Sequence, residues 1–300
     1  MDDTLYHYLQ HLCGVDNVLR DEPLAKHTTW RVGGNADYLV TVPDKNTLCR
    51  VLSALVFLDE PYFVLGLGAN VLASDQGFRG VVLTLGFTTI THNDDFLYAD
   101  AGAKLATVVG YARDHGLSGL EWATGIPATV GGAAYMNCGA FGHSFSDLVV
   151  LVDVLDRGVV KTLTANQLDY GYRHSVFMDV PYVILGVYLR LDKGDPATIG
   201  QTMADILARR AHHPKLPSAG SVFKRPRDGF YVGAEIEKLG LKGYRVGDAM
   251  VSPEHANFIV NTGHATADDI LKVLYHVQDT VAAATGVAIE PEIIFLGEFN

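Results

Sequence analysis

The stretch Gly125-Ile-Pro-Ala-Thr-Val-Gly-Gly-Ala-Ala-Tyr-Met-Asn-Cys-Gly-Ala-Phe-Gly142 contains five glycines and four alanines among its eighteen residues. Half of its positions therefore carry little or no side chain, which lets another backbone segment or a flat ligand approach closely. Two interpretations stay open at this point. The stretch is either a tight helix crossing in the core, where small residues also collect, or one wall of a ligand site.

A second glycine-rich segment favours the ligand site. Gly66-Leu-Gly-Ala-Asn70 directly follows the apolar run Tyr62 to Leu65, in the order of a strand followed by a loop. Exposed backbone amides at such a place can hold a phosphate group. We therefore expect the two glycine segments to serve the same ligand.

Composition limits the class of protein. With 300 residues, of which 48% are hydrophobic and 19% charged, the chain is long enough for two or three globular domains. The net charge of −11 argues against a nucleic-acid surface, while small anionic ligands remain compatible with it.

The cysteines and the N-terminus indicate a cytoplasmic protein. Cys13, Cys49 and Cys138 are odd in number and widely spaced, so we expect neither a disulfide framework nor a zinc site. The first five residues are acidic where a signal peptide would be basic, and no apolar run has the length of a membrane span.

Hydrophobic periodicity predicts an α+β fold, because the strands are too short and irregularly spaced for a doubly wound parallel sheet. Helices are predicted at 5–13, 47–58, 104–115, from 196 to about 210, and at 266–285. Strands are predicted at 36–42, 62–65, 81–85, 96–101, 148–155, 159–163, 182–191, 218–223, 256–261 and 293–296. The segment 36–65 reads as a β-α-β unit, 148–163 as a hairpin, and the last strand as part of a sheet in the last domain.

Several segments, taken together, resemble the UDP-N-acetylenolpyruvoylglucosamine reductase family of flavoproteins over nearly the whole chain. They are His27-Thr-Thr-Trp-Arg-Val-Gly-Gly34, Leu65-Gly-Leu-Gly-Ala-Asn70, the Gly125 to Gly142 stretch, Tyr172-Arg-His-Ser-Val-Phe177, Ala219-Gly-Ser-Val-Phe-Lys-Arg-Pro226, His255-Ala-Asn-Phe-Ile-Val-Asn261 and Pro291-Glu-Ile293. One glycine loop would be a weak signal, whereas this many motifs in the family's order are specific.

The resemblance implies an FAD-binding half of two subdomains, of the type shared with vanillyl-alcohol oxidase and p-cresol methylhydroxylase, and a C-terminal α+β substrate-binding domain. We place the FAD-binding subdomains at 1–85 and 86–195 and the substrate-binding domain at 196–300. The family has a longer type with an extra tyrosine-bearing loop. The direct run from Arg227-Asp-Gly-Phe-Tyr231 to Gly240 and Tyr244 resembles the shorter type, which lacks that loop.

The activity that the resemblance implies uses NADPH to reduce FAD. A hydride then passes to the enolpyruvyl double bond of UDP-N-acetylglucosamine enolpyruvate and gives UDP-N-acetylmuramate for peptidoglycan. The enolate-like species that results must be protonated on carbon. The protein therefore has to stabilise negative charge, position a carboxylate and deliver a proton.

The resemblance places Arg173, Ser221 and Glu292 in the active site. The charged fork of Arg173 suits a planar carboxylate or enolate. Ser221 would be the proton donor, because an enolate carbon takes a proton even from a weakly acidic hydroxyl. Glu292, with Glu290 as its rival, would pair with Arg173 or, if protonated, donate a hydrogen bond. Outside these motifs, the three would read as a surface arginine, a turn serine and a solvated glutamate.

Further residues are expected to hold the ligands. Cofactor contacts are expected from Gly66, Gly68, Ala69, Asn70, Gly125, Thr129, Gly131 and Gly132. Contacts to the sugar or diphosphate of the substrate are expected from Tyr172, Lys224 and Asn257. No metal site is expected, because the adjacent His212 and His213 would not share one helix face and no other group has ligand spacing.

The main basic cluster is Arg209, Arg210 and Lys215. It reads equally well as positive charge placed favourably at a helix C-terminus and as a phosphate-binding group.

Two other functions are alternatives to the reductase. Another flavin oxidoreductase of the same superfamily, acting on an unrelated alcohol, is disfavoured by Ser221 and Glu292 in their motifs. A non-catalytic flavin-binding or scaffold protein is favoured only by Ala69. No obligate protein partner is evident from the sequence.

The FAD loop departs from the family pattern, which commonly has glycine and serine where this chain has Leu67 and Ala69. The hydroxyl expected near the pyrophosphate is missing, so backbone amides alone remain to bind it. We expect Ala69→Ser to raise the affinity for FAD, measured by titrating the cofactor into both proteins. Equal affinities would count against this hypothesis.

Overall fold

The structure is a computed structural model that describes residues 3–299. Its helices are α1 (Asp3–Cys13), α2 (Lys45–Phe57), α3 (Leu105–Asp114), α4 (Val130–Tyr135), α5 (Pro196–Arg210), α6 (Val232–Lys238) and α7 (Ala267–Thr285). Its strands are β1 (Val18–Pro23), β2 (Asn35–Val42), β3 (Tyr62–Val64), β4 (Val71–Ala73), β5 (Phe78–Leu85), β6 (Ile90–Asn93), β7 (Phe96–Asp100), β8 (Leu117–Ser118), β9 (Gly139–Ala140), β10 (His143–Ser144), β11 (Val149–Asp156), β12 (Val159–Thr164), β13 (Val183–Arg190), β14 (Asp192–Lys193), β15 (Arg245–Val246), β16 (Ala249–Val251), β17 (Ile259–Asn261) and β18 (Ile294–Leu296). Within residues 3–299, every helix is too short or too polar to cross a lipid bilayer.

The chain packs into two compact units. The first comprises Met1–Leu19, Tyr38–Leu67 and Gly80–Ala211, and the second comprises Arg20–Asp37, Gly68–Arg79 and His212–Asn300. The expected functional boundaries after residues 85 and 195 stay predictions.

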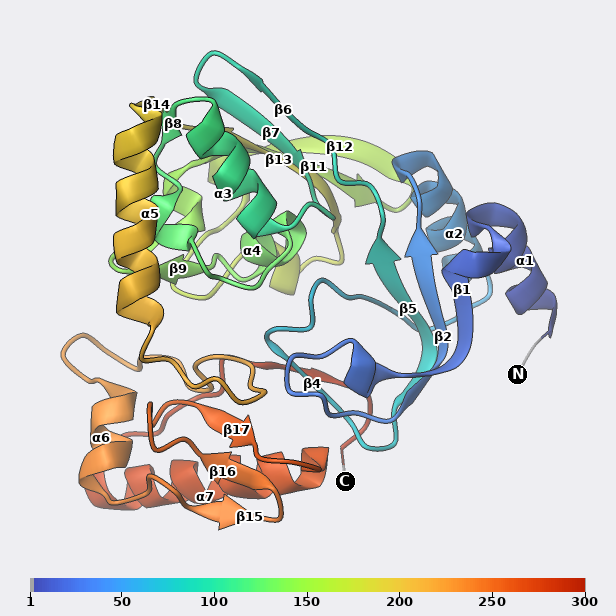
Figure 1. The fold of residues 1–300 in the computed structure, drawn as a ribbon. Helices are drawn as coiled ribbons and strands as arrows, with labels where there is room; N and C mark the ends of the chain where they lie inside the picture. Colours follow the sequence, from blue (N-terminus) through green and yellow to red (C-terminus); the bar gives the residue numbers. More distant parts are fainter. Residues whose placement is uncertain (1–2, 300) are drawn as a thin grey trace. The chain divides into compact units, whose positions relative to one another are not determined.

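A five-stranded sheet of order β12-β11-β13-β7-β6 forms the centre of the first unit (Figure 1). Its neighbouring strands are antiparallel. Helices α3 and α4 pack against it, since their buried residues share one core with β7, β11 and β13. The predicted hairpin is confirmed: β11 pairs with β12, and Arg157 and Gly158 turn the chain with φ angles of 47° and 83°.

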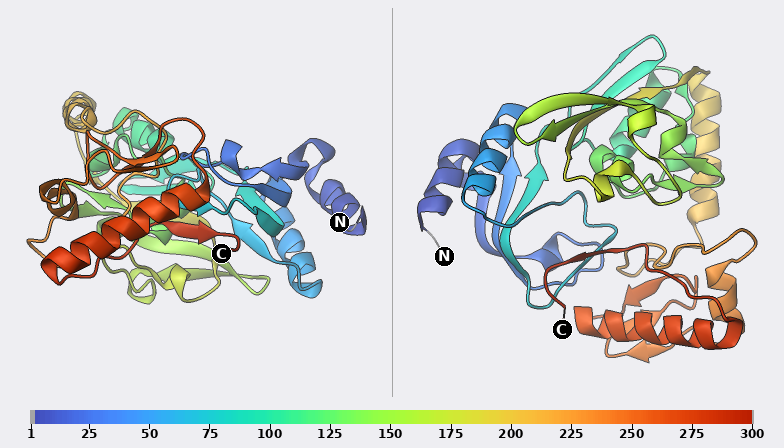
Figure 2. Two further views of the ribbon diagram at one scale, coloured as in Figure 1. Left: turned by 90° about the horizontal axis from the view of Figure 1, so that it is seen from below. Right: turned by 180° about the vertical axis from the view of Figure 1, so that it is seen from behind.

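A second sheet has the order β1-β2-β5-β3, with β3 parallel to β5. The two strands of the predicted β-α-β unit, β2 and β3, are therefore not neighbours, because β5 lies between them. Helix α2 connects them and packs beside α1 through a shared core (Figure 2). Asp44 caps α2, since its carboxylate accepts a hydrogen bond of 2.9 Å from the Thr47 N–H.

The second unit is built on α7, which packs against the antiparallel sheet β15-β16-β17 (Figures 1 and 2). The sequence predicted this helix correctly. Thr266 and Asp269 form a capping box at its start, and Gly286 ends it in the left-handed region at φ 69°.

In the second unit, one predicted strand does not form, and another forms but joins a different sheet. Residues 218–223 form only isolated bridges, Ser218 to Val260 and Phe223 to Pro291, because Gly220 interrupts the extended run with a φ of 76°. The last strand, β18, does not join the three-stranded sheet. It pairs in parallel with β4, which directly follows the glycine loop.

Trp30 ties the motif 27–34 to β17. Its side chain is fully buried, and the indole Nε1 donates a 2.7 Å hydrogen bond to the carbonyl of Ile259. In turn, Asn261 Nδ2 donates a 3.0 Å hydrogen bond to the Trp30 carbonyl. The motif therefore has a structural role in the second unit.

We expect Trp30→Phe to destabilise the protein by about 1–3 kcal/mol, because it leaves the buried Ile259 carbonyl without its donor. Trp122→Phe is the matched control, since Trp122 is also buried and its indole nitrogen donates to no group within residues 3–299. Urea unfolding of both variants measures the difference. Equal losses would show that ring volume, and not the hydrogen bond, decides the cost.

Candidate functional site

The stretch 125–142 runs against the end of β7 in the first unit. Val130 and Gly131 donate backbone hydrogen bonds of 2.8 and 2.9 Å to the carbonyls of Ala103 and Ala101. A β-carbon at Gly131 would lie 3.1 Å from Ala101 Cβ, so this glycine serves close packing. Close packing in the core thus requires a glycine here, and the cofactor contact expected of Gly131 stays a prediction.

The second glycine segment meets this stretch at Thr129. A β-carbon on Gly66 would lie only 2.8 Å from Thr129 Oγ1, so no larger residue fits there without displacing the threonine. Thr129 itself caps α4, because its hydroxyl accepts a 3.2 Å hydrogen bond from the Gly132 N–H. Both segments line one cavity of about 450 Å³, together with Leu65, Leu67, Thr84, Leu85, Thr88, Ile90, Gly102, Ala103, Lys104 and Thr107.

The glycine loop offers a row of backbone donors. Within residues 3–299, the N–H groups of Gly66, Leu67, Gly68 and Ala69 donate to no other group. Gly68 is in the left-handed region at φ 61°, which turns the chain so that successive amides can face one ligand. Such a row suits the pyrophosphate of a dinucleotide.

The stretch also holds the predicted catalytic arginine. Arg173 has a φ of 54°, and its guanidinium donates to the carbonyls of Gly139 at 2.9 Å and Asn137 at 3.4 Å. Asn137 is buried, and its Nδ2 donates to the carbonyl of Gly171 at 2.8 Å. Tyr172, the predicted substrate contact, is 52% exposed and lies 5.3 Å from the Arg173 guanidinium, measured to the ring centroid.

The loop that carries Arg173 is clamped by its neighbours. The ring of His174 lies 3.1 Å from the Asp169 carbonyl through Nδ1 and 3.0 Å from the Asp179 carboxylate through Nε2. Ser175 donates a 2.6 Å hydrogen bond to the Tyr135 carbonyl at the end of α4. Asp169, His174 and Asp179 are near enough to ligate an ion, but these bonds already account for the grouping as a loop clamp.

In the second unit, the backbone brings Ser221 and Glu292 to neighbouring segments. Val222, the residue after Ser221, donates to the carbonyl of Asn257 at 2.8 Å, and the Glu292 N–H donates to the Val222 carbonyl at 2.7 Å. Ser221 and Glu292 are both half-buried.

Geometry separates Glu292 from its rival. Glu290 is exposed and forms an ion pair of 3.8 Å with Lys224, a predicted substrate contact. Glu292 is half-buried, and its carbonyl accepts a 3.0 Å hydrogen bond from Asn70 Nδ2. The side chain of Asn70, predicted to bind the cofactor, thus also fixes the segment that carries Glu292.

Asn257 acts on the backbone next to Ser221. Its Oδ1 accepts a 3.1 Å hydrogen bond from the Phe223 N–H, and its Nδ2 donates a 3.0 Å hydrogen bond to the Phe223 carbonyl. Both ends of the amide are therefore engaged in holding the segment 221–224. This arrangement favours a positioning role over the predicted substrate contact.

Sequence reasoning missed four residues, three in the first unit and Trp30 in the second. Asn137 and Trp30 read as ordinary members of their motifs, although both fix the backbone. Thr124 Oγ1 and Tyr170 Oη are buried and have no hydrogen-bond partner within residues 3–299. Buried hydroxyls of this kind usually have a partner, so these two fit a site that a polar ligand completes.

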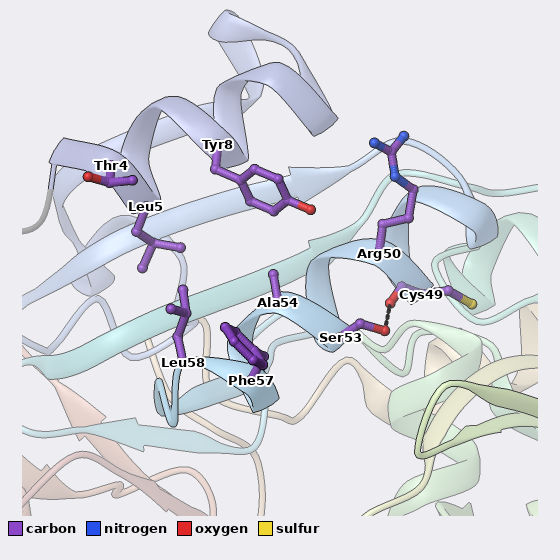
Figure 3. A pocket seen from close by; sticks show the side chains of 9 residues that line it. All are labelled: Thr4, Leu5, Tyr8, Cys49, Arg50, Ser53, Ala54, Phe57 and Leu58. Atoms are coloured by element: carbon purple, nitrogen blue, oxygen red, sulfur yellow. Dashed lines mark hydrogen bonds between the residues drawn. The ribbon is translucent and has the colours of Figure 1, made fainter.

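Another cavity, of about 570 Å³, lies between α1 and α2 (Figure 3). Its polar groups do not converge on one point. The Ser53 hydroxyl already donates to the Cys49 carbonyl at 2.7 Å, and the remaining lining is largely the apolar surface of Leu5, Ala54 and Phe57. This cavity gives no indication of chemistry.

We expect Asn257→Ala to slow the step that needs Ser221 while leaving FAD binding intact, because the variant frees the backbone of Phe223. The rate of this step in Asn257→Asp should lie between those of Asn257→Ala and the wild type, since aspartate keeps the acceptor for the Phe223 N–H. Cofactor titration and single-turnover kinetics of substrate reduction measure the two effects. A loss of FAD affinity that matches the loss of rate would contradict the positioning role.

The comparisons with known proteins agree over most of the chain. Residues 36–163 match the profile of an FAD-binding domain, and residues 212–296 match the profile of the UDP-N-acetylenolpyruvoylglucosamine reductase C-terminal domain. The UDP-N-acetylenolpyruvoylglucosamine reductase of Agathobacter rectalis is 41% identical over 94% of this chain and 95% of its own length. That of Levilactobacillus brevis is 42% identical over 94% of this chain and 93% of its own length.

A solved structure supports the same assignment. The crystal structure of the Thermus caldophilus enzyme is similar with a TM-score of 0.81 at 36% identity, and the match covers 93% of this chain and 98% of that one. The expected fold, an FAD-binding half followed by a C-terminal reductase domain, is confirmed. The chain belongs to the UDP-N-acetylenolpyruvoylglucosamine reductase family of FAD-dependent oxidoreductases.

Proposed function

We propose that this chain reduces UDP-N-acetylglucosamine enolpyruvate to UDP-N-acetylmuramate, with FAD as its cofactor and NADPH as the reductant. The observation that carries the proposal is the row of backbone amides at Gly66, Leu67, Gly68 and Ala69, which have no partner among the described residues 3–299. Four consecutive donors suit the pyrophosphate of FAD. When bound, FAD supplies the hydride that the protein's own side chains cannot supply.

The residues of the chain bind and orient the substrate and deliver the proton. Arg173 binds the enolpyruvyl carboxylate, because its guanidinium is held by two backbone carbonyls and its planar set of N–H donors matches a carboxylate. Ser221 Oγ donates the proton to carbon. Glu292 lies on the segment hydrogen-bonded to the Ser221 segment and stabilises charge near the same carboxylate.

The remaining assignments are part of the same proposal. Thr129, Gly132 and the loop 66–70 surround the cofactor, while Lys224 and Tyr172 hold the diphosphate or sugar. Asn257 and Asn70 keep the reacting segments in place. Because the three cysteines fit a reducing compartment, we place the reaction in the cytoplasm.

Anaerobic absorbance separates this function from its alternatives. Purified protein loaded with FAD should bleach with NADPH and regain its yellow colour when the enolpyruvyl substrate is added. Bleaching without recolouring would favour an oxidoreductase with another substrate. A protein that takes up no FAD would favour a non-catalytic role.

We expect Ser221→Ala to leave the reduction of FAD by NADPH nearly unchanged and to slow substrate reduction severely, because only the second step needs the proton. Ser218→Ala is the matched control in the same segment. Stopped-flow absorbance at the flavin band measures both steps. If both steps slow equally in Ser221→Ala, the proton-donor role is wrong.

A further inference from the structure

Arg210, at the C-terminal end of α5, is a half-buried arginine with one fully buried guanidinium nitrogen. Its Nη2 donates to the Trp122 carbonyl at 3.3 Å, and its Nε is buried and has no acceptor within residues 3–299. Burial lowers the pKa of this guanidinium from its ordinary value. No carboxylate lies within ion-pair distance of it in the part of the chain that the structure describes. A buried N–H without an acceptor is costly, which points to a ligand as its partner.

Both ends of the glycine stretch contact Arg210. A β-carbon on Gly125 would lie 3.1 Å from Arg210 Cδ, and Gly125 itself has a φ of 83°. The guanidinium lies 5.0 Å from the ring centroid of Phe141 near the other end of the stretch. Because Gly125 has no side chain, the guanidinium can lie directly against the backbone of the stretch.

Two further buried polar atoms without partners gather around the same stretch. Thr124, which is only 7% exposed, precedes Gly125 and has an unpartnered Oγ1. The Oη of Tyr170 is also buried without a partner, and both Tyr170 and Arg210 lie near enough to Cys138 to interact electrostatically with it. Within residues 3–299, one guanidinium nitrogen and two hydroxyls next to the stretch 124–141 therefore have no hydrogen-bond partner.

We propose that Arg210 contacts the polar edge of the flavin ring and stabilises its reduced form, with Thr124 and Tyr170 as neutral hydrogen-bond partners of the same edge. This inference rests on the FAD site of the proposed function. The pyrimidine edge of a flavin carries two carbonyl acceptors and one N–H donor. A hydroxyl can accept from that N–H and can also donate to a carbonyl, whereas a phosphate offers acceptors alone. The unsatisfied set, one cation and two hydroxyls, thus fits the flavin edge better than a diphosphate.

The charge balance gives Arg210 its effect. A hydride brings two electrons and one proton, so the ring system gains one negative charge when it accepts a hydride. A fixed guanidinium beside that charge favours the reduced state over the oxidised state. Arg210 therefore makes bound FAD easier to reduce.

The test compares Arg210→Met with Arg209→Met in the FAD-loaded protein. Arg209 is the matched control, because it is exposed and also contacts Phe141. Its guanidinium lies 4.0 Å from the Phe141 ring centroid. The midpoint potential of bound FAD is measured by equilibrium with a redox dye. We expect Arg210→Met to weaken the preference for the reduced state by about tenfold or more. For a two-electron couple, this makes the midpoint potential about 30 mV more negative. Arg209→Met should leave the midpoint potential unchanged. Arg210→Lys keeps the positive charge, so its midpoint potential should stay close to that of the wild type.

Arg210→Gln serves if the methionine variant does not fold, since it keeps an N–H donor for the Trp122 carbonyl and removes only the charge. An unchanged potential in the folded neutral variant would overturn the proposal. If the potential is unchanged but the oxidised variant binds UDP-sugar more weakly, the proposal is wrong and Arg210 binds the substrate diphosphate instead. Failure of the wild type to take up FAD would instead contradict the proposed function.

Discussion

The close approach of Gly66 to Thr129 is the contact on which the cofactor site depends. A β-carbon at position 66 would lie 2.8 Å from Thr129 Oγ1, so the loop can meet the glycine stretch only without a side chain there. The same threonine caps α4, whose following residues hold Arg173 through the carbonyls of Asn137 and Gly139. One stretch of small residues thus forms part of a cavity wall, starts a helix and supports the arginine proposed to bind the substrate carboxylate.

In the second unit, Ser221 and Glu292 lie on irregular backbone that neighbouring segments hold in place. The backbone of Val222 hydrogen-bonds to Asn257 and Glu292. The side-chain amide of Asn257 bonds to both the N–H and the carbonyl of Phe223. Asn70 links the Glu292 segment to the glycine loop, and β18 pairs with β4 just beyond it. Each reacting side chain therefore stands on backbone that is fixed by at least one neighbouring segment.

The sequence was sufficient for the long periodic elements and insufficient for irregular backbone. Helix α7, with its capping box and terminal Gly286, and the hairpin at Gly158 carry local signals that the structure confirms. The segment 218–223 has the composition of a strand, but the φ of Gly220 breaks it. The pairing of β18 with β4 and the clamp by Asn257 depend on contacts between distant residues, which no local pattern encodes. The unsatisfied Nε of Arg210 likewise appears only once burial is known.

The structure of the protein with bound FAD tests the central claim most directly, because the account assigns the pyrophosphate to a named row of donors. We predict that its oxygens accept hydrogen bonds from the backbone N–H groups of Gly66, Leu67, Gly68 and Ala69, which have no other partner within residues 3–299. A pyrophosphate bound elsewhere, with these four amides still without a partner, would contradict the account.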